Sequence, residues 1–418
     1  MIRHFLPVAA LLLGSALLLF AGGINALLLP VRGSAEGFSA TALGLLGTAW
    51  AIGYVSGCLL TPRLVGRVGH IRSFSVMCAL AAVAILMSLV LIDPAAWLPL
   101  RAISGFCFAG AAMIVESWLS ERTDPGSRGR VFGIYTMVNL AATTAGQMAL
   151  TLGSTAGYTF FVIGAVFYCL ALVPTAISSS AAPNPLVSVK LDLRGLWRNS
   201  PVAVVGVFLV GISNSAFGTL AAVYADRVGL VLTTIALFTS IPILAGAASQ
   251  IPVGWMSDRV DRRKVLILLA LLAMVADAAF ILLAPEGRAM NLALAALFGA
   301  SVFAMYPVIL AHANDHAAEG SFIQTSGGLL MVFGLGSIIG PLAAGIAMSK
   351  LGEQGLFLTS VVAHALLILF TLSRIALRAA VAEKDKSGFV AATPGRPVTP
   401  ETAAMALEVQ QDQEKDAA

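Results

Sequence analysis

Long uninterrupted apolar runs recur along almost the whole chain, and they constrain the fold more than any other feature. Each run is about 20 residues long, which is what an α-helix needs to cross roughly 30 Å of hydrocarbon. Hydrophobic residues make up 58% of the chain and charged residues only 11%, so one soluble core could not bury this apolar surface. Transmembrane strands would be half as long and would alternate polar with apolar residues. The sequence therefore predicts an all-α membrane protein.

Twelve such segments are predicted to be transmembrane helices, arranged as two pseudo-symmetric bundles of six. They cover approximately residues 5–30, 41–61, 73–92, 97–120, 131–152, 156–177, 201–223, 233–254, 265–284, 291–312, 321–348 and 355–376. The first segment begins after Arg3 and His4, as a signal peptide would. Its apolar part is too long for a signal peptide and a second span soon follows, so we interpret it as a helix.

The longest internal polar stretch divides the chain into two halves. We expect an N-terminal six-helix bundle over residues 1–177 and a C-terminal bundle over residues 201–376. The cytoplasmic linker, residues 178–200, ends in "KLDLRGLWRNSP", where basic residues four apart flank leucines and a tryptophan. That spacing fits a short helix on the membrane surface, with an ordinary solvated linker as the alternative. Residues 377–418 are polar and predict a disordered cytoplasmic tail.

Basic residues predict the orientation. With a cytoplasmic N-terminus, and with the long tail left out, 14 Lys and Arg residues lie on the cytoplasmic side and five elsewhere. This asymmetry predicts that both termini are cytoplasmic. The net charge of +4 then reflects topology and gives no indication of nucleic-acid binding.

The two halves also repeat. A shift of about 192 residues superposes Gly37 on Gly229 and Arg67 on Arg259, and the loops and charge clusters keep register over about 100 residues. Such register is expected of parallel repeats related by an axis along the membrane normal.

A dense charge cluster lies between the eighth and ninth segments, in "GWMSDRVDRRKVL" (residues 254–266). Its spacing is Gly254-x-x-x-Asp258-Arg259-x-x-Arg262-Arg263. This loop resembles the signature loop of the major facilitator superfamily in spacing, charge order and position.

The first half carries a weaker copy of this loop in "PRLVGRVGHIR". The copy keeps Arg67, Gly69 and Arg72 but has Gly66 where the family has an aspartate. The second-half copy departs from the family at Asp261, where a glycine is usual.

Two further stretches extend the resemblance. In the fourth segment, the spacing Arg101-x-x-x-Gly105-x-x-x-Ala109 is similar to the buried-arginine motif of the superfamily. Residues 116–135, "ESWLSERTDPGSRGRVFGIY", resemble the YcaD-like branch. The resemblance covers about residues 5–376 and implies two six-helix bundles that rock about a central cavity.

The resemblance implies that the first, fourth, seventh and tenth helices surround this cavity. The polar candidates on these helices and their neighbours are Asn25, Arg101, Ser117, Asn139, Gln147, Asn214, Ser215, Gln250, Tyr306 and Gln324. Each one alone could equally form a helix–helix hydrogen bond. Together they suit a small polar or amphipathic solute.

Three ionisable residues lie within the apolar segments, where a lone charge is costly. Arg101 could bind an anionic solute or oppose a carboxylate, or it could be an interfacial arginine. Asp277 is either a proton-coupling site or a satisfied acid. Glu116 is either part of an ion pair at the gate or a proton site.

The signature loops are expected to form the inner gate. Pseudo-symmetry places Asp258 against the start of the fifth helix, where Arg128 or Arg130 could pair with it. The alternative is that the charge cluster only sets orientation. The gate candidates are Arg67, Arg72, Arg128, Arg130, Asp258, Arg259, Arg262 and Arg263.

These patterns predict a monomeric secondary transporter of the inner membrane, working by a rocker-switch mechanism and coupled to protons. The alternatives are a facilitated-diffusion uniporter and a non-transporting receptor or scaffold. The sequence contains no nucleotide loop, metal cluster or nucleophile–base pair, so we expect no enzyme activity, no cofactor and no nucleic-acid partner. A small molecule and membrane lipid are the expected partners.

Overall fold

The computed structural model describes residues 2–123, 127–177, 192–317 and 321–394. Within these ranges the chain is almost entirely helical and contains no strand. It forms two compact units, one built from Met1–Gly37 and Ala49–Ser188 and the other from Phe38–Thr48 and Val189–Pro400. The predicted fold class, an all-α membrane protein, is confirmed. The exact bundle boundaries stay predictions.

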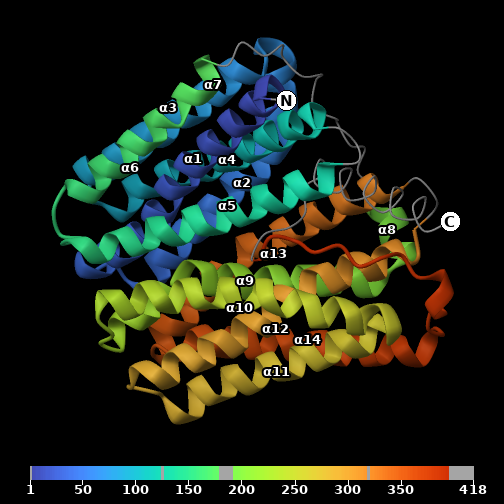
Figure 1. Cartoon of the computed structure of the whole chain (residues 1–418). Coiled ribbons are helices and arrows are strands. Elements are labelled where there is room, and N and C mark those ends of the chain that lie inside the picture. Colours follow the sequence, from blue (N-terminus) through green and yellow to red (C-terminus); the bar gives the residue numbers. More distant parts are fainter. Residues whose placement is uncertain (1, 124–126, 178–191, 318–320, 395–418) are drawn as a thin grey trace. The chain divides into compact units, whose positions relative to one another are not determined.

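Figure 1 shows the helices coloured in chain order from blue to red. The first half contains α1 (Ile2–Ala35), α2 (Ala40–Val68), α3 (His70–Val90), α4 (Pro94–Arg122), α5 (Arg128–Ala149), the short η2 (Leu150–Leu152), α6 (Thr159–Leu170) and α7 (Leu172–Ile177). The second half contains α8 (Leu193–Asn199), α9 (Pro201–Arg227), α10 (Leu232–Arg259), α11 (Arg262–Leu283), α12 (Arg288–Asn314), α13 (Phe322–Leu351), α14 (Gly355–Leu377) and η3 (Glu383–Asp385).

Eleven helical stretches in the described part of the chain are long and apolar enough to cross a membrane, one fewer than predicted. The missing one is α5, which is a helix of 22 residues but has a lower hydropathy. Its polar side chains include Asn139, Thr143, Thr144 and Gln147. The fifth predicted segment is thus a helix, as expected, and polar side chains already named as cavity candidates, Asn139 and Gln147, contribute to its lower hydropathy.

The sixth predicted span is a helix with a break. α6 ends at Leu170 and α7 begins at Leu172, and together they cover Thr159–Ile177. Pro174 lacks the N–H that would bond to the carbonyl of Leu170. This missing hydrogen bond accounts for the interruption.

Glycines let α2 and α4 pack with their main chains in contact. A Cβ atom added at Gly53 would lie 1.9 Å from the carbonyl oxygen of Ala102, and one at Gly105 would lie 2.0 Å from that of Trp50. Gly105 belongs to the arginine motif of the fourth segment. Arg101 lies one turn earlier on the same helix and is half-buried.

The first turns of α2 pack within the second unit. The hydroxyl of Thr48 donates to the carbonyl of Ile338 at 2.7 Å, and the hydroxyls of Thr41 and Ser349 are 2.9 Å apart. A Cβ atom at Gly44 would lie 2.3 Å from the carbonyl oxygen of Pro341. α2 is thus the helix whose two ends belong to different units.

The core of the second unit is aromatic at one end. Phe280 of α11 stacks on Phe357 of α14 with ring centroids 3.9 Å apart, and Tyr224 of α9 meets Phe357 edge-on at 4.8 Å. α9 packs on α13, α14 and α12, while α11 packs on α12 and α14. In helices that span a membrane, such ring contacts stabilise the packing by van der Waals attraction rather than by removal of the rings from water.

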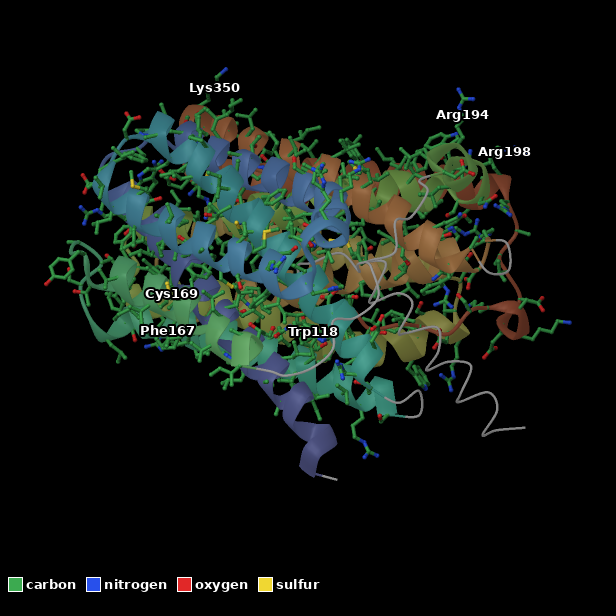
Figure 2. All side chains as sticks on the ribbon, turned by 90° about the horizontal axis from the view of Figure 1, so that it is seen from above. Trp118, Phe167, Cys169, Arg194, Arg198 and Lys350 are labelled. Carbon is green, nitrogen blue, oxygen red and sulfur yellow. The ribbon has the colours of Figure 1, made fainter. Side chains whose placement is uncertain are left out.

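The predicted linker helix lies partly within the described residues. Leu196 of α8 is buried, and it would contact a Cβ atom added at Gly328 of α13 at 3.1 Å. Arg194 and Arg198 are exposed, and Figure 2 shows Arg194 projecting away from the protein. Lys190 lies outside the described residues. Leu193 and Trp197 are exposed as well, and the position of this helix on the membrane surface stays a prediction.

The first part of the predicted tail lies within the described residues. Residues 378–394 have defined positions, and several of them bond to α10 and to the end of α12. The polar composition that predicted disorder supplies the donors and acceptors for these contacts. Residues 395–418 lie outside the described part of the chain.

Candidate functional site

A polar cluster lies among α1, α4 and α6 in the first unit. Asn25 of α1 is buried, and its side chain lies close to the hydroxyl of Tyr168 in α6. The charge of Arg101 in α4 interacts with the same tyrosine. The structure thus brings together two of the predicted cavity residues, Asn25 and Arg101, around a tyrosine that the sequence did not single out.

Unused bonding capacity remains in this cluster. The Oδ1 atom of Asn25 is buried and has no hydrogen-bond partner among the described residues. Arg101 has no acidic partner within the described part of the chain. A buried acceptor and a guanidinium without a counter-ion are both costly in hydrocarbon, so they are typical of a site that binds a ligand.

The other candidates of the first unit have protein partners or partial exposure. Asn139 accepts a hydrogen bond from Ser15 of α1 at 2.9 Å, as a helix–helix contact would. The hydroxyl of Tyr135 in α5 donates to the buried carboxylate of Glu116 at 3.3 Å. Gln147 is buried and Ser117 is half-buried. Glu116 is therefore held between α4 and α5 within one unit.

The candidates of α9, α12 and α13 differ in their surroundings. Asn214 is buried, and its Oδ1 atom has no partner among the described residues. Ser215 donates to Gly211 of its own helix at 2.6 Å, which makes it a local contact. Tyr306 is buried edge-on against Phe333. Gln324 is exposed near the start of α13.

Asp277 has a partner that the sequence analysis missed. Its Oδ2 atom lies 3.0 Å from Nδ1 of His364 in α14, and both side chains are fully buried. His364 was not singled out from the sequence. An imidazole inside an apolar run is itself a costly intramembrane group, and that signal could have found His364.

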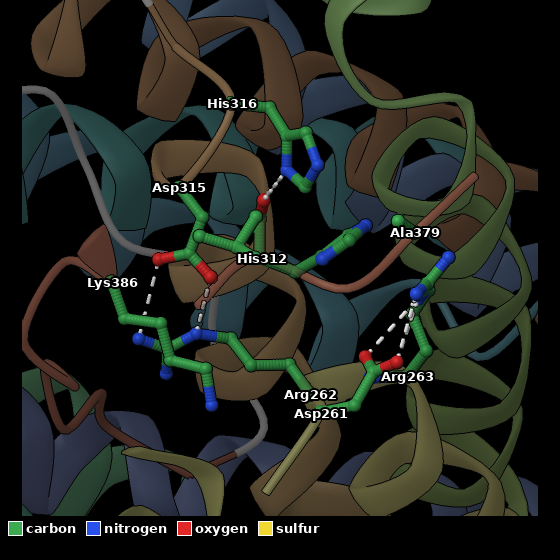
Figure 3. Close-up of a pocket in the computed structure, with 9 residues that line it drawn as sticks. Asp261, Arg262, Arg263, His312, Asp315, His316, Ala379 and Lys386 are labelled. Atoms are coloured by element: carbon green, nitrogen blue, oxygen red, sulfur yellow. Dashed lines mark hydrogen bonds and ion pairs between the residues drawn. The ribbon is translucent and has the colours of Figure 1, made fainter. Parts of the chain in front are cut away.

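The signature loop forms a buried cluster around Arg262, shown in Figure 3. The side chain of Arg262 is 1% exposed, and its Nε donates to Oδ2 of Asp315 at 2.7 Å. Its Nη1 donates to Ser257 at 2.8 Å and to Asp258 at 3.2 Å. Asp315 follows α12 directly and was not among the predicted gate residues. Charge-assisted bonds of this kind tie the ends of α10, α11 and α12 together.

Arg263 and Asp261 form a second pair in the same pocket. Asp261 caps α11 by accepting from the N–H of Arg263 at 3.0 Å, and Nη2 of Arg263 lies 2.8 Å from Oδ2 of Asp261. Burial raises the pKa of the Asp261 carboxyl, but the bonds from Arg263 outweigh it, so the net pKa lies below its usual value. This capping role explains why an aspartate replaces the usual glycine here.

The remaining gate candidates are exposed, or their side chains lie outside the described residues. Asp258 has a side chain that is 42% exposed and bonds to Arg262, and the guanidinium of Arg259 lies 4.4 Å from the ring centroid of Trp255. Arg67, Arg72 and Arg130 are exposed, and the side chain of Arg128 lies outside the described residues. The predicted contact of Asp258 with the start of α5 stays a prediction.

The family model of the major facilitator superfamily matches residues 11–246 and 203–403. The chain belongs to this superfamily. It is 26% identical over 358 residues to an uncharacterised MFS-type transporter of Yersinia pestis, covering 84% of this chain and 91% of that protein. It is 27% identical over 364 residues to the MFS-type transporter YcaD of Shigella flexneri, with the same coverage. The resemblance to the YcaD-like branch is thereby confirmed.

Solved structures of transporters share the fold. A mutant of the nucleoside transporter NupG superposes with a TM-score of 0.77 at 13% identity, covering 88% of this chain and 99% of that one. A second structure is that of a bacterial homologue of the human lysosomal transporter Spinster in an inward-facing and occupied conformation. It superposes with a TM-score of 0.69 at 16% identity, covering 91% of this chain and 97% of that one. This superfamily member is a multi-pass membrane transporter.

Proposed function

We propose that this superfamily member is a monomeric, proton-coupled secondary transporter of the inner membrane with both termini in the cytoplasm. It carries a small polar solute by rocking of its two units. The relatives named as bacterial transporters support the compartment, and the 14-to-5 distribution of basic residues supports the orientation.

The observation that carries the proposal is the cluster of Arg101, Asn25 and Tyr168. A guanidinium in hydrocarbon without a carboxylate partner favours an anionic or strongly hydrogen-bond-accepting group on the solute. The amide of Asn25 and the hydroxyl of Tyr168 add neutral hydrogen-bonding groups. The solute that fits this cluster is small, polar and anionic in part.

The proposed coupling rests on Glu116 and Asp277. Both carboxyl groups are buried, and each bonds to a neutral or titratable side chain, Tyr135 and His364 respectively. A buried acid of this kind can take up and release a proton when access to it alternates. A facilitated-diffusion uniporter only equilibrates its solute, so it would need neither group.

Substitution of Arg101 tests the solute site. An untargeted uptake screen with the parent chain identifies the solute, after which Arg101→Ala is expected to reduce its uptake by at least about 100-fold, the loss of roughly 3 kcal/mol of a charge-assisted contact. Arg101→Lys should restore part of it. Arg288→Ala, which removes an exposed arginine that is not among the gate or cavity candidates, is the matched control. Normal uptake by Arg101→Ala, with normal expression, would refute this role.

Proton coupling is tested with the conservative variants Glu116→Gln and Asp277→Asn. At least one is expected to lose gradient-driven accumulation in proteoliposomes while it keeps solute exchange, because exchange needs no net proton movement. Full accumulation by both variants would rule out coupling through these acids. Uptake by the parent chain that stops at equal solute concentrations and does not respond to an imposed proton gradient would favour the uniporter.

A further inference from the structure

The chain does not leave the second unit after α14. Residues 378–394 run back across the helices of this unit, and Figure 1 shows them in red beyond the end of α14. Apart from the single turn η3, they form no helix or strand. We call residues 386–392 the C-terminal strap.

The strap begins with a cation at the end of α10. Nζ of Lys386 donates to the main-chain oxygens of Ser257, Asp258 and Val260 at 3.1, 3.1 and 2.7 Å. α10 ends at Arg259. The last carbonyls of a helix lack partners within it and carry partial negative charge, so an ammonium group is favoured there.

The next residue joins the buried ion pair. The main-chain N–H and the hydroxyl of Ser387 both donate to Oδ1 of Asp315, at 2.9 and 2.8 Å. The carbonyl of Ser387 accepts from Nη2 of Arg262. Three polar groups of one strap residue are thus bound by Arg262 and Asp315.

An aromatic ring then packs on the main chain of α10. A Cβ atom added at Gly254 would lie 2.7 Å from Cδ1 of Phe389, closer than real side chains approach. The ring of Phe389 therefore occupies the space that any other residue at position 254 would fill. Gly254 is the first residue of the signature loop.

The strap ends on a predicted cavity residue. The Nε2 atom of Gln250 donates to the carbonyl of Ala392 at 2.8 Å, and the N–H of Ala392 donates to Oε1 of Gln250 at 2.8 Å. Gln250 is 4% exposed and Ala392 is 7% exposed. Both ends of the Gln250 amide are engaged, so this side chain cannot bind a solute while the strap is docked.

We propose that the C-terminal strap is an autoinhibitory ligand of its own chain, which occupies Gln250 and the end of α10 and must leave before a solute can bind there. The inference rests on the proposed function in one respect, that Gln250 faces the path of the solute. The contacts that hold the strap are mostly hydrogen bonds of an irregular segment. Such segments open at lower free energy than packed helices, so release is compatible with an intact unit.

Hydrogen exchange tests the docking itself. The amides of Ser387 and Ala392 should be protected in the full chain in detergent, because each donates to a side chain. Lys386→Ala is expected to lower their protection about tenfold, the equivalent of about 1.4 kcal/mol for one charge-assisted anchor. Lys384→Ala is the matched control, since Lys384 is exposed and makes none of these contacts. Exchange of both amides at the rate of an unstructured peptide in the parent chain would overturn the proposal.

Thiol labelling tests whether the strap covers position 250. The full chain carrying Gln250→Cys should react slowly with N-ethylmaleimide at position 250. The labelling of the native cysteines in the parent chain is subtracted to obtain this rate. Adding Lys386→Ala and Phe389→Ala should raise its rate at least about tenfold, and adding Lys384→Ala should not. Equal rates in all these chains would show that the strap does not cover Gln250. Neither measurement needs a transported solute, so failure here leaves the proposed transport function standing, and failure of transport leaves the strap intact.

Discussion

Arg262 and Asp315 form a buried bidentate ion pair, with Nε and Nη2 of the arginine 2.7 and 3.3 Å from the two carboxylate oxygens. Their side chains are 1% and 2% exposed. Two charges withdrawn from water this far are stable only as a pair, because the desolvation cost of either one alone is several kcal/mol. The pair therefore fixes the ends of α11 and α12 against each other.

Asp315→Asn is expected to destabilise the protein by about 3–5 kcal/mol, because it leaves the Arg262 charge buried with little compensation. Asp258→Asn should cost less than about 1 kcal/mol, since the Asp258 side chain is 42% exposed and its attraction to Arg262 is screened. Thermal unfolding of both variants in the same detergent checks the ranking. A larger effect of Asp258→Asn would place the main counter-ion of Arg262 at position 258 instead.

Gly105→Ala is expected to destabilise the first unit by about 1–3 kcal/mol, because its Cβ atom would lie 2.0 Å from the carbonyl oxygen of Trp50. Gly66→Ala in α2 is the control. A Cβ atom at Gly66 meets nothing within 4 Å, so alanine there should be neutral or stabilise by roughly 0.5–1 kcal/mol. Unfolding midpoints of the two variants give the comparison. Equal unfolding midpoints for the two variants would mean that α2 and α4 can move apart to accommodate the methyl group with little loss of stability.

Asp277→Leu and His364→Phe are each expected to destabilise the second unit, because each leaves one buried polar partner of the 3.0 Å contact unsatisfied. The double variant should lose less than the sum of the two single losses, with a coupling of about 0.5–3 kcal/mol. A double-mutant cycle measured by unfolding tests this. Additive losses would show that the contact contributes no stability.

His316 is expected to make stability depend on pH. Burial lowers the pKa of its imidazole, and the charges of Arg378 and Arg263 lower it further. The bond to the carbonyl of His312 and the charge of Asp315 raise the pKa by less, so the net pKa lies below the usual value. A histidine whose folded-state pKa is lowered contributes stability above its unfolded pKa of about 6.5 and loses that contribution as pH falls through the folded value. The protein should therefore become less stable below about pH 6.5. His316→Asn should flatten this part of the unfolding profile, and an unchanged slope would assign it to other groups.

The sequence alone was enough to predict the membrane-spanning helices and the signature loop, because both depend on local composition and spacing. The length of each apolar run specifies a membrane-spanning helix whatever its neighbours are, because the hydrocarbon forces every backbone group to bond within its own segment. The spacing from Gly254 to Arg263 likewise identified the signature loop and its superfamily, as the match over residues 11–246 and 203–403 shows. α5 forms a helix as predicted, with a lower hydropathy than the other long helices because of its polar side chains.

The tertiary structure alone decided which polar groups meet. Arg262 lies 53 residues from Asp315 and 125 from Ser387, and Asp277 lies 87 residues from His364. A helix sequence shows which face a polar side chain occupies, but the partner on that face depends on how helices distant in sequence pack. Gln250 illustrates the difference, because its position in α10 suggested a solute contact and its observed partner is the main chain of Ala392. In a low-dielectric interior every buried polar group needs a partner, and folding selects that partner by proximity in space.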